Sequence, residues 1–219
     1  MSLPIHQISG LPSKGPRHPQ LLALPGEIGP GLMRGRVHEF CGPSRIAFAL
    51  MTLSLSTGPV IWAAPAWFPE RPYSCGMRDY LHPGRIIFVQ CRRAEDIQWA
   101  MEEGLRSGTA PVVVAEFPEP PNLTAVRRLH LAAETALGTG QTAPIGLLLT
   151  PGSGGAQGVE SRWQANPMPA PSGLLDSEGI ALQIRLSRAR QARPQDWRLI
   201  RAADGGTVAQ PLAAQHSQA

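Results

Sequence analysis

The residues with the strongest chemical implication lie where an apolar segment ends at Gly42-Pro43. A turn between a strand and a helix is where many nucleotide-binding proteins hold phosphate, with the pattern G-x-x-x-x-G-K-[ST]. Its glycines let backbone N–H groups wrap the phosphates, its lysine neutralises them and its hydroxyl holds Mg²⁺. Here the loop reads Cys41-Gly42-Pro43-Ser44-Arg45. The second glycine and the lysine are missing, and the loop is shortened.

No other lysine repairs this loop, because Lys14 is the only one and lies in a proline-rich segment. Arg45 supplies charge but not the backbone nest that phosphate chemistry also needs. We therefore expect neither an ATP cofactor nor an enzyme. The degenerate nucleotide site comprises Gly42, Pro43, Ser44, Arg45 and Glu116. Glu116 ends an apolar run where an acid often accompanies such a loop, although a solvated strand-end carboxylate is the simpler interpretation.

A second candidate site is a group of arginines with one tryptophan near the C-terminus. Its members are Arg185, Arg188, Arg190, Arg193, Trp197, Arg198 and Arg201. Such a group would bind DNA phosphates or the acidic surface of a partner. Equally, it would form a solvated edge hairpin whose charges prevent aggregation. The net charge of +4 favours a nucleic-acid partner only modestly.

Metal chemistry has little support, because the histidines are scattered and His38-Glu39 lacks the second histidine of H-E-x-x-H, which would fall at Gly42. The three cysteines have no metal-like spacing. Their odd number, with no signal peptide, predicts a cytoplasmic protein. The apolar stretch 46–64 is broken by Gly58-Pro59, so we expect a helix and a strand rather than a membrane span.

Hydrophobic periodicity predicts the elements that must position these residues. Strands are expected at 36–41, 60–63, 85–90, 110–117 and 145–149, and helices at 44–56, 94–107 and 122–137. The strands are apolar throughout and alternate with helices. This order predicts an α/β core with a mostly parallel sheet covered on both faces.

Composition divides the chain into five predicted parts. These are a flexible proline-rich arm at 1–30, the core at 31–165, a proline-rich linker at 166–177, a basic antiparallel β-hairpin appended at 178–209 and a disordered tail at 210–219. The hairpin would pair strands near 180–186 and 197–201. The glycine-rich segment 151–158 does not match a phosphate-binding motif, and we interpret it as a flexible linker.

Several sequence blocks resemble the ImuA family. They are Gly35–Phe40, Val60–Trp62, Trp99–Gly108, Arg127–Glu134, Ser161–Trp163 and the basic segment Ile184–Arg190, and together the resemblance covers about residues 31–202. The combination of E-E-x-L-R-S-G, a hydrophobic strand and R-R-L-x-L-A-A-E carries most of it.

The resemblance implies a RecA-like three-layer core, since that family is similar to RecA and to the cell-division inhibitor SulA. It also implies a role in SOS-induced translesion synthesis. The implied partners are an ImuB-like protein and, through it, an error-prone C-family polymerase, with the RecA filament and DNA as further candidates.

Three functions follow. The first is a non-catalytic adaptor of mutagenic translesion synthesis. The second is a nucleotide-dependent RecA-like ATPase with an atypical loop that uses Arg45 and Glu116. The third is a SulA-like inhibitor of cell division, which would not need the added basic hairpin.

Overall fold

The computed structural model describes residues 21–68, 71–135, 142–169 and 179–212. Along the chain the elements are β1 (Leu21–Leu22), a 3-10 turn (Pro25–Glu27), β2 (Leu32–Met33), β3 (Val37–Cys41), α1 (Arg45–Leu53), β4 (Val60–Pro65), α2 (Ser74–Met77), a second 3-10 turn (Pro83–Arg85), β5 (Ile86–Cys91), α3 (Ala94–Ser107), β6 (Val112–Glu116), α4 (Leu123–Thr135), β7 (Ile145–Thr150), β8 (Ser161–Pro167), β9 (Ile180–Ala189), β10 (Gln195–Arg201) and β11 (Thr207–Leu212).

One large sheet organises the molecule, with the strand order β11-β10-β9-β8-β3-β7-β6-β4-β5. The strands from β8 to β5 pair in parallel, and β8 to β11 pair antiparallel. The predicted α/β class, with a mostly parallel sheet and antiparallel strands at the C-terminal end, is therefore confirmed. Every residue of β7 is buried, as a strand covered on both faces requires.

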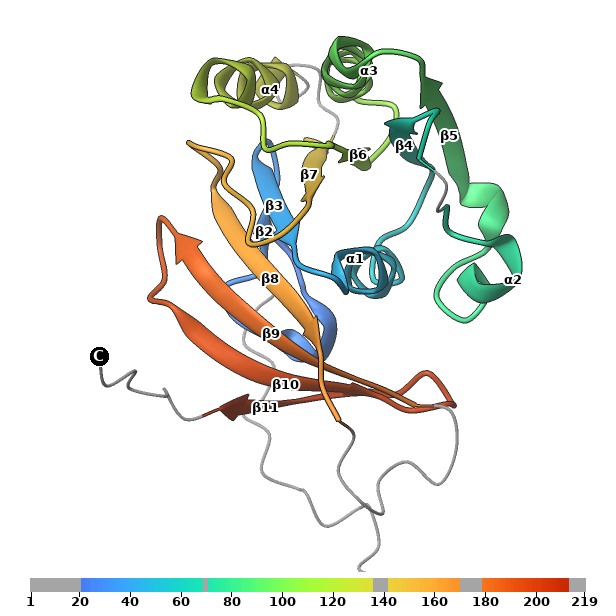
Figure 1. Ribbon diagram of the computed structural model, residues 1–219, viewed down its shortest axis with the longest axis vertical. Coiled ribbons are helices and arrows are strands. Elements are labelled where there is room, and N and C mark those ends of the chain that lie inside the picture. Colours follow the sequence, from blue (N-terminus) through green and yellow to red (C-terminus); the bar gives the residue numbers. More distant parts are fainter. Residues whose placement is uncertain (1–20, 69–70, 136–141, 170–178, 213–219) are drawn as a thin grey trace, which may run out of the picture.

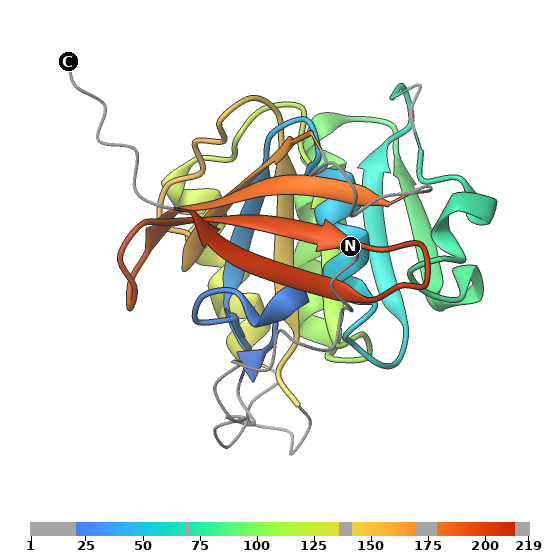
Figure 2. The ribbon, with the colours of Figure 1, turned by 90° about the horizontal axis from the view of Figure 1, so that it is seen from below.

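Helices cover both faces of the parallel part, which gives three layers. Figure 1 shows α3 and α4 on one face and α1 on the other, with the antiparallel strands curling beneath α1. Seen from below, β9, β10 and β11 cross the underside of the molecule (Figure 2). One buried cluster lies around α1 and includes Phe48, Trp62 and Trp163. The other lies under α3 and α4 and includes Met101 and Leu129.

The predicted division into an arm, a core and an appendage differs from the structure. Leu22, Leu24 and Ile28 are buried in the α1 cluster, so residues 21–30 belong to the core rather than to a flexible arm. The predicted hairpin is not an appendage either, because β8 joins β9 and β10 to β3 in one sheet. Residues 210–212, predicted to begin a disordered tail, instead form the end of β11 and pair with β10. Residues 1–20, 170–178 and 213–219 of the predicted arm, linker and tail lie outside the described residues.

β5 was predicted to be a buried strand, and that prediction is wrong. It lies at the edge of the sheet, where Ile87 is 53% exposed and Phe88 is 40% exposed. The apolar run therefore correctly indicated a strand, but it did not indicate whether that strand is buried. Within the described part of the chain, no helix is long and apolar enough to cross a membrane.

Candidate functional site

The loop after β3 uses its backbone N–H groups within the protein. The Ser44 N–H donates to the Ala165 carbonyl of β8 at 3.0 Å, and the Arg45 N–H donates to the Gly42 carbonyl at 3.3 Å. A phosphate nest needs successive N–H groups aimed at the anion. Since two donors of this short loop are already bonded to carbonyl oxygens, the loop is closed as a phosphate site.

Gly42 has a different role from the glycine of a phosphate loop. Its φ is +90°, and a Cβ built on it would lie 2.4 Å from the Ala165 carbonyl oxygen. Only glycine therefore permits β8 to pass so close to the loop. Arg45 turns back as well, because its Nη1 donates to the Gly42 carbonyl at 3.2 Å. Both residues serve contacts within the chain.

Glu116 stands at the end of β6, where a solvated carboxylate was expected. It is instead only 3% exposed, so that interpretation is wrong. The Trp62 indole Nε1 of β4 donates to Glu116 Oε1 at 2.7 Å. The indole binds the carboxylate from a neighbouring strand in the core of the sheet.

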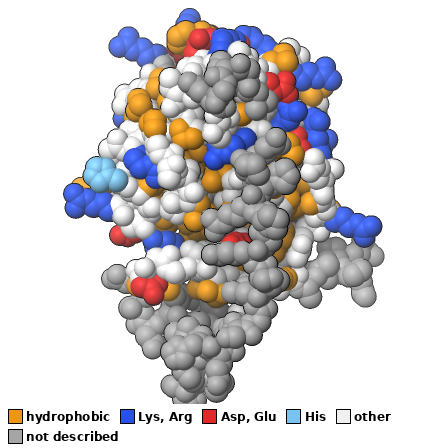
Figure 3. Space-filling view, turned by 180° about the vertical axis from the view of Figure 1, so that it is seen from behind, with side chains coloured by type: hydrophobic (Ala, Val, Ile, Leu, Met, Phe, Trp, Pro, Cys, Tyr) orange, Lys and Arg blue, Asp and Glu red, His pale blue; other side chains and the backbone are white. Residues whose placement is uncertain are grey.

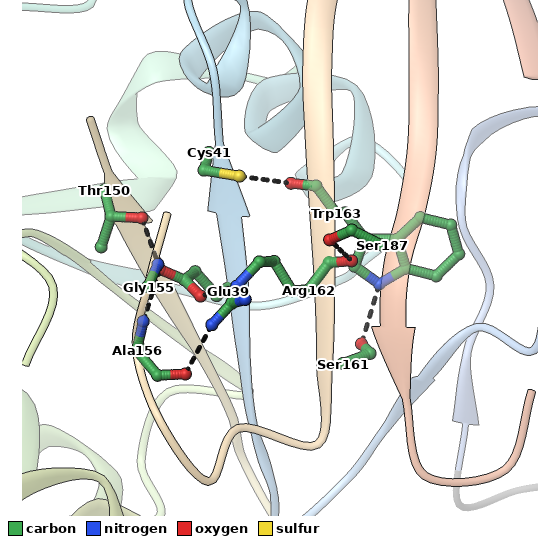
Figure 4. Close-up of polar contacts among 9 residues, drawn as sticks. All are labelled: Glu39, Cys41, Thr150, Gly155, Ala156, Ser161, Arg162, Trp163 and Ser187. Carbon is green, nitrogen blue, oxygen red and sulfur yellow. Dashed lines mark hydrogen bonds and ion pairs between the residues drawn. The ribbon is translucent and has the colours of Figure 1, made fainter. Parts of the chain in front are cut away.

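The most heavily bonded side chain of this region is Glu39 of β3, which is fully buried (Figure 4). Its Oε1 accepts from Thr150 Oγ1 at 2.7 Å, from the Gly155 N–H at 2.9 Å and from the Ala156 N–H at 3.1 Å. Its Oε2 lies 2.5 Å from Arg162 Nε. A buried carboxylate with both oxygens bonded holds its neighbours in place rather than acting as a free base.

This carboxylate orders the glycine-rich segment 151–158, which was expected to be a flexible linker. Gly155 and Ala156 bind it through their backbones, and Arg162 Nη2 closes the ring by donating to the Ala156 carbonyl at 2.8 Å. That expectation is therefore wrong. From the sequence, Glu39 was considered only as part of a metal motif. A charged residue inside an apolar strand is the signal that it needed a partner.

His38 joins β2, β3 and β8 through a directional set of hydrogen bonds. Its Nε2 lies 3.0 Å from the Met33 carbonyl, which can only accept, so Nε2 carries the proton and Nδ1 accepts from Ser161 Oγ at 2.7 Å. Ser161 Oγ in turn accepts from Trp163 Nε1 at 2.8 Å. Burial lowers the pKa of His38 to about 4. The serine and the histidine are both buried, so this pair holds the strands together instead of presenting a nucleophile.

The arginine group at the C-terminal end is only partly available to a partner. Arg185, Arg188, Arg190 and Arg193 are exposed, whereas Arg198 and Arg201 are half-buried. Arg185 pairs with Asp196 at 3.4 Å and Arg190 with Glu160 at 3.5 Å. Both arginines are mostly exposed, whereas their acidic partners are largely covered by the protein, so these are not simple surface pairs.

The two half-buried arginines pack against the protein itself. Arg198 Nε lies 3.3 Å from Met168 Sδ, and the Arg201 guanidinium sits 4.5 Å above the Tyr80 ring. On the face seen in Figure 3, basic side chains are dispersed among apolar and polar ones rather than gathered in one patch.

Trp197 was predicted to contact DNA or a partner, and that prediction is wrong. It is 5% exposed, and its ring packs against Trp163 with 5.8 Å between the centroids. Trp197 lies on the face of β10 that is turned toward α1, and the arginines exposed on β9 lie outside that core. The alternation of a half-buried strand separates them.

The described residues contain no group of histidine, cysteine or acidic side chains able to hold a metal ion. Neither the protein-family models nor the curated proteins compared with this chain match it. Among solved structures, SulA from Pseudomonas aeruginosa is similar over 52% of this chain and 98% of its own, with 18% sequence identity and a TM-score of 0.42. A likeness this remote says nothing specific about function.

Proposed function

We propose that this chain is a non-catalytic adaptor of SOS-induced mutagenic translesion synthesis. It acts by binding an ImuB-like protein and, through it, an error-prone C-family polymerase. The observation that carries the non-catalytic part is the closed loop after β3. There the Ser44 N–H is bonded to Ala165, and no lysine stands beside it.

The buried Glu39–Arg162 pair supports the same conclusion. It fixes the segment 151–158 and β8 against β3, so the strand that closes the loop is itself held in place. Opening a phosphate site would require β8 to move away from Gly42 and would disturb this buried ion pair. The alternative of a nucleotide-dependent ATPase therefore has little support.

The part of the proposal that names partners rests on the sequence blocks that resemble the ImuA family. The exposed arginines Arg185, Arg188, Arg190 and Arg193 provide a surface for an acidic partner or for the DNA backbone. Because both β9 and the connection to β10 carry them, they border one end of the antiparallel part of the sheet.

Co-purification with the ImuB-like protein of the same organism tests the proposal. We expect a complex at micromolar concentration without nucleotide. Arg188→Glu should weaken it, whereas Arg127→Glu, an equal change of charge on the exposed side of α4, should leave it intact. Absence of a complex at micromolar concentration would count against the adaptor. ATP turnover by the purified chain, with or without single-stranded DNA, would count against the non-catalytic assignment.

A further inference from the structure

The outer edge of β5 is an open position in the sheet. β5 is the last strand in the order, and no described residue pairs with it on its outer side. Alternate residues of an edge strand turn their N–H and C=O groups outward, where another strand can pair with them. Proteins usually blunt such an edge with proline, charge or a covering segment.

The two edges of this sheet differ in that respect. At the opposite edge, β11 contains Pro211, which has no N–H to donate. β5 has no proline and reads Ile86-Ile87-Phe88-Val89-Gln90-Cys91. It exposes Ile87 and Phe88 in its middle. One edge is therefore blunted and the other presents an apolar strand.

The exposed residues of β5 lie on both faces of the sheet. Ile87 is in register with Ile61, and Phe88 is in register with Trp62, so the two side chains point to opposite faces. The Phe88 ring packs beside Trp62 at 6.2 Å between centroids. The Ala66 N–H donates to the Cys91 carbonyl, which places the half-exposed Trp67 next to the end of β5. An added strand would find apolar contacts on both sides.

The arginines at the two ends of β5 determine which kind of strand can pair with its outer edge. Arg85 precedes β5, and its guanidinium donates to the neutral Gly58 carbonyl and Ser56 Oγ. Arg92 follows β5, and the next residue, Arg93, pairs with Asp96. If two copies paired antiparallel with full overlap, Ile86 would face Cys91, and Arg85 of each copy would face Arg92 of the other. Like charges directly opposite each other destabilise a strand pair. Self-pairing is therefore disfavoured, while acidic residues at both ends of an incoming strand would be attracted.

We propose that the outer edge of β5 binds an extended segment of a partner protein, in which a few apolar residues are flanked by acidic ones. The segment adds a strand to the sheet, its apolar side chains cover Ile87 and Phe88, and its acidic residues face the arginines at either end. This inference rests on the proposed adaptor function and deepens it, because it gives the chemistry of one partner segment.

Selection of linear peptides from a phage-displayed library on the full chain tests the proposal. We expect enriched peptides to combine apolar and acidic residues and to bind more weakly as salt is raised. Ile87→Lys should weaken a synthesised peptide by about tenfold or more, the loss expected for one buried aliphatic side chain. Arg92→Glu should weaken it as well. N-methylation of alternate peptide N–H groups should abolish binding in one phase of alternation and spare it in the other.

Val208→Lys is the matched control. Val208 lies on β11 and is 49% exposed, close to the 53% of Ile87, so the same substitution tests the opposite edge. Peptides that bind equally well to wild type and to Ile87→Lys, or that lack acidic residues, would overturn the proposal. So would a dimer of the wild-type chain that Ile87→Lys dissociates, since the edge would then bind a second copy. If no peptide binds the chain but the ImuB-like protein still co-purifies with it, the proposal for the β5 edge is rejected and the adaptor function is not.

Discussion

Replacing Glu39 by glutamine probes the buried ion pair that holds β8 and the segment 151–158 against β3. In the glutamine variant, the amide oxygen can still accept the three hydrogen bonds that Oε1 accepts in the wild type. The amide NH₂ must then face Arg162 Nε, so that two hydrogen-bond donors oppose each other. Breaking a buried pair by removing one partner typically costs about 3–5 kcal/mol. The Arg162 side chain is 19% exposed, and solvent reaching it places the expected cost of Glu39→Gln near the lower limit, about 3 kcal/mol.

A double-mutant cycle with Arg162→Met separates the pair from its surroundings. Arg162→Met alone leaves the carboxylate short of one partner and the Ala156 carbonyl without its side-chain donor. Once Glu39 is neutral, the same change removes an unpaired charge. The double variant should therefore be more stable than the sum of the single changes implies, by about 1–3 kcal/mol.

Chemical denaturation with guanidinium measures these differences from the unfolding midpoint at constant slope. Glu103→Gln is a matched control, because Glu103 also pairs with an arginine but on the exposed side of α3. It should leave the midpoint near that of wild type. Additive single changes, or a cost of Glu39→Gln no larger than that of Glu103→Gln, would show that the Glu39–Arg162 pair does not stabilise the fold.

Three further outcomes are expected. His38 and His130 are both kept neutral, because burial lowers the pKa of each to about 4. The unfolded chain binds more protons below its histidine pKa of about 6.5, so stability should fall as pH drops from about 6.5 to 4, by at most roughly 3 kcal/mol for each residue. His130→Gln should flatten that profile in denaturation at several pH values, and an unchanged profile would contradict the assignment. Gly42→Ala should cost more than about 2 kcal/mol, because φ is +90° and Ala165 blocks the Cβ. A wild-type midpoint would contradict it. Trp197→Ala should lower the free energy of unfolding by about 3–5 kcal/mol, because Trp197 is a core residue. A loss below about 0.5 kcal/mol would indicate that Trp197 is a surface residue.

Local patterns in the sequence were enough to predict the parallel part of the fold. The helix Ala94–Ser107 has its predicted bounds, and the strands at 36–41, 60–63 and 145–149 differ from β3, β4 and β7 by one or two residues at their ends. These elements repeat apolar residues at the helix or strand period over a sufficient length. The loss of nucleotide binding, inferred from the degenerate loop at Gly42 and the missing lysine, stays a prediction.

Features of the structure that depend on pairing between distant segments could not be predicted from local sequence patterns. β8 was not predicted because Ser161–Pro167 is half polar, and its strand form depends on pairing with β3 and β9. The exposure of β5 depends on the strand order, which apolar composition does not encode. The partners of Glu39 come from positions more than 100 residues away.

The second candidate site stays a prediction for its exposed arginines, whereas the structure places Trp197 in the core. A basic, alternating segment indicated an exposed strand with arginines on its outer side, as β9 shows for Arg185. The same alternation places Trp197 on the inner face, where it packs against Trp163. That contact could not be predicted from a local sequence pattern.

If this chain acts by binding and not by nucleotide chemistry, ATP should not change its affinity for its partner. Calorimetric titration with the ImuB-like protein of the same organism, with and without ATP and Mg²⁺, tests it most directly. We expect micromolar or tighter binding with the same Kd in both conditions. Binding that requires ATP, or no binding in either condition, would contradict it.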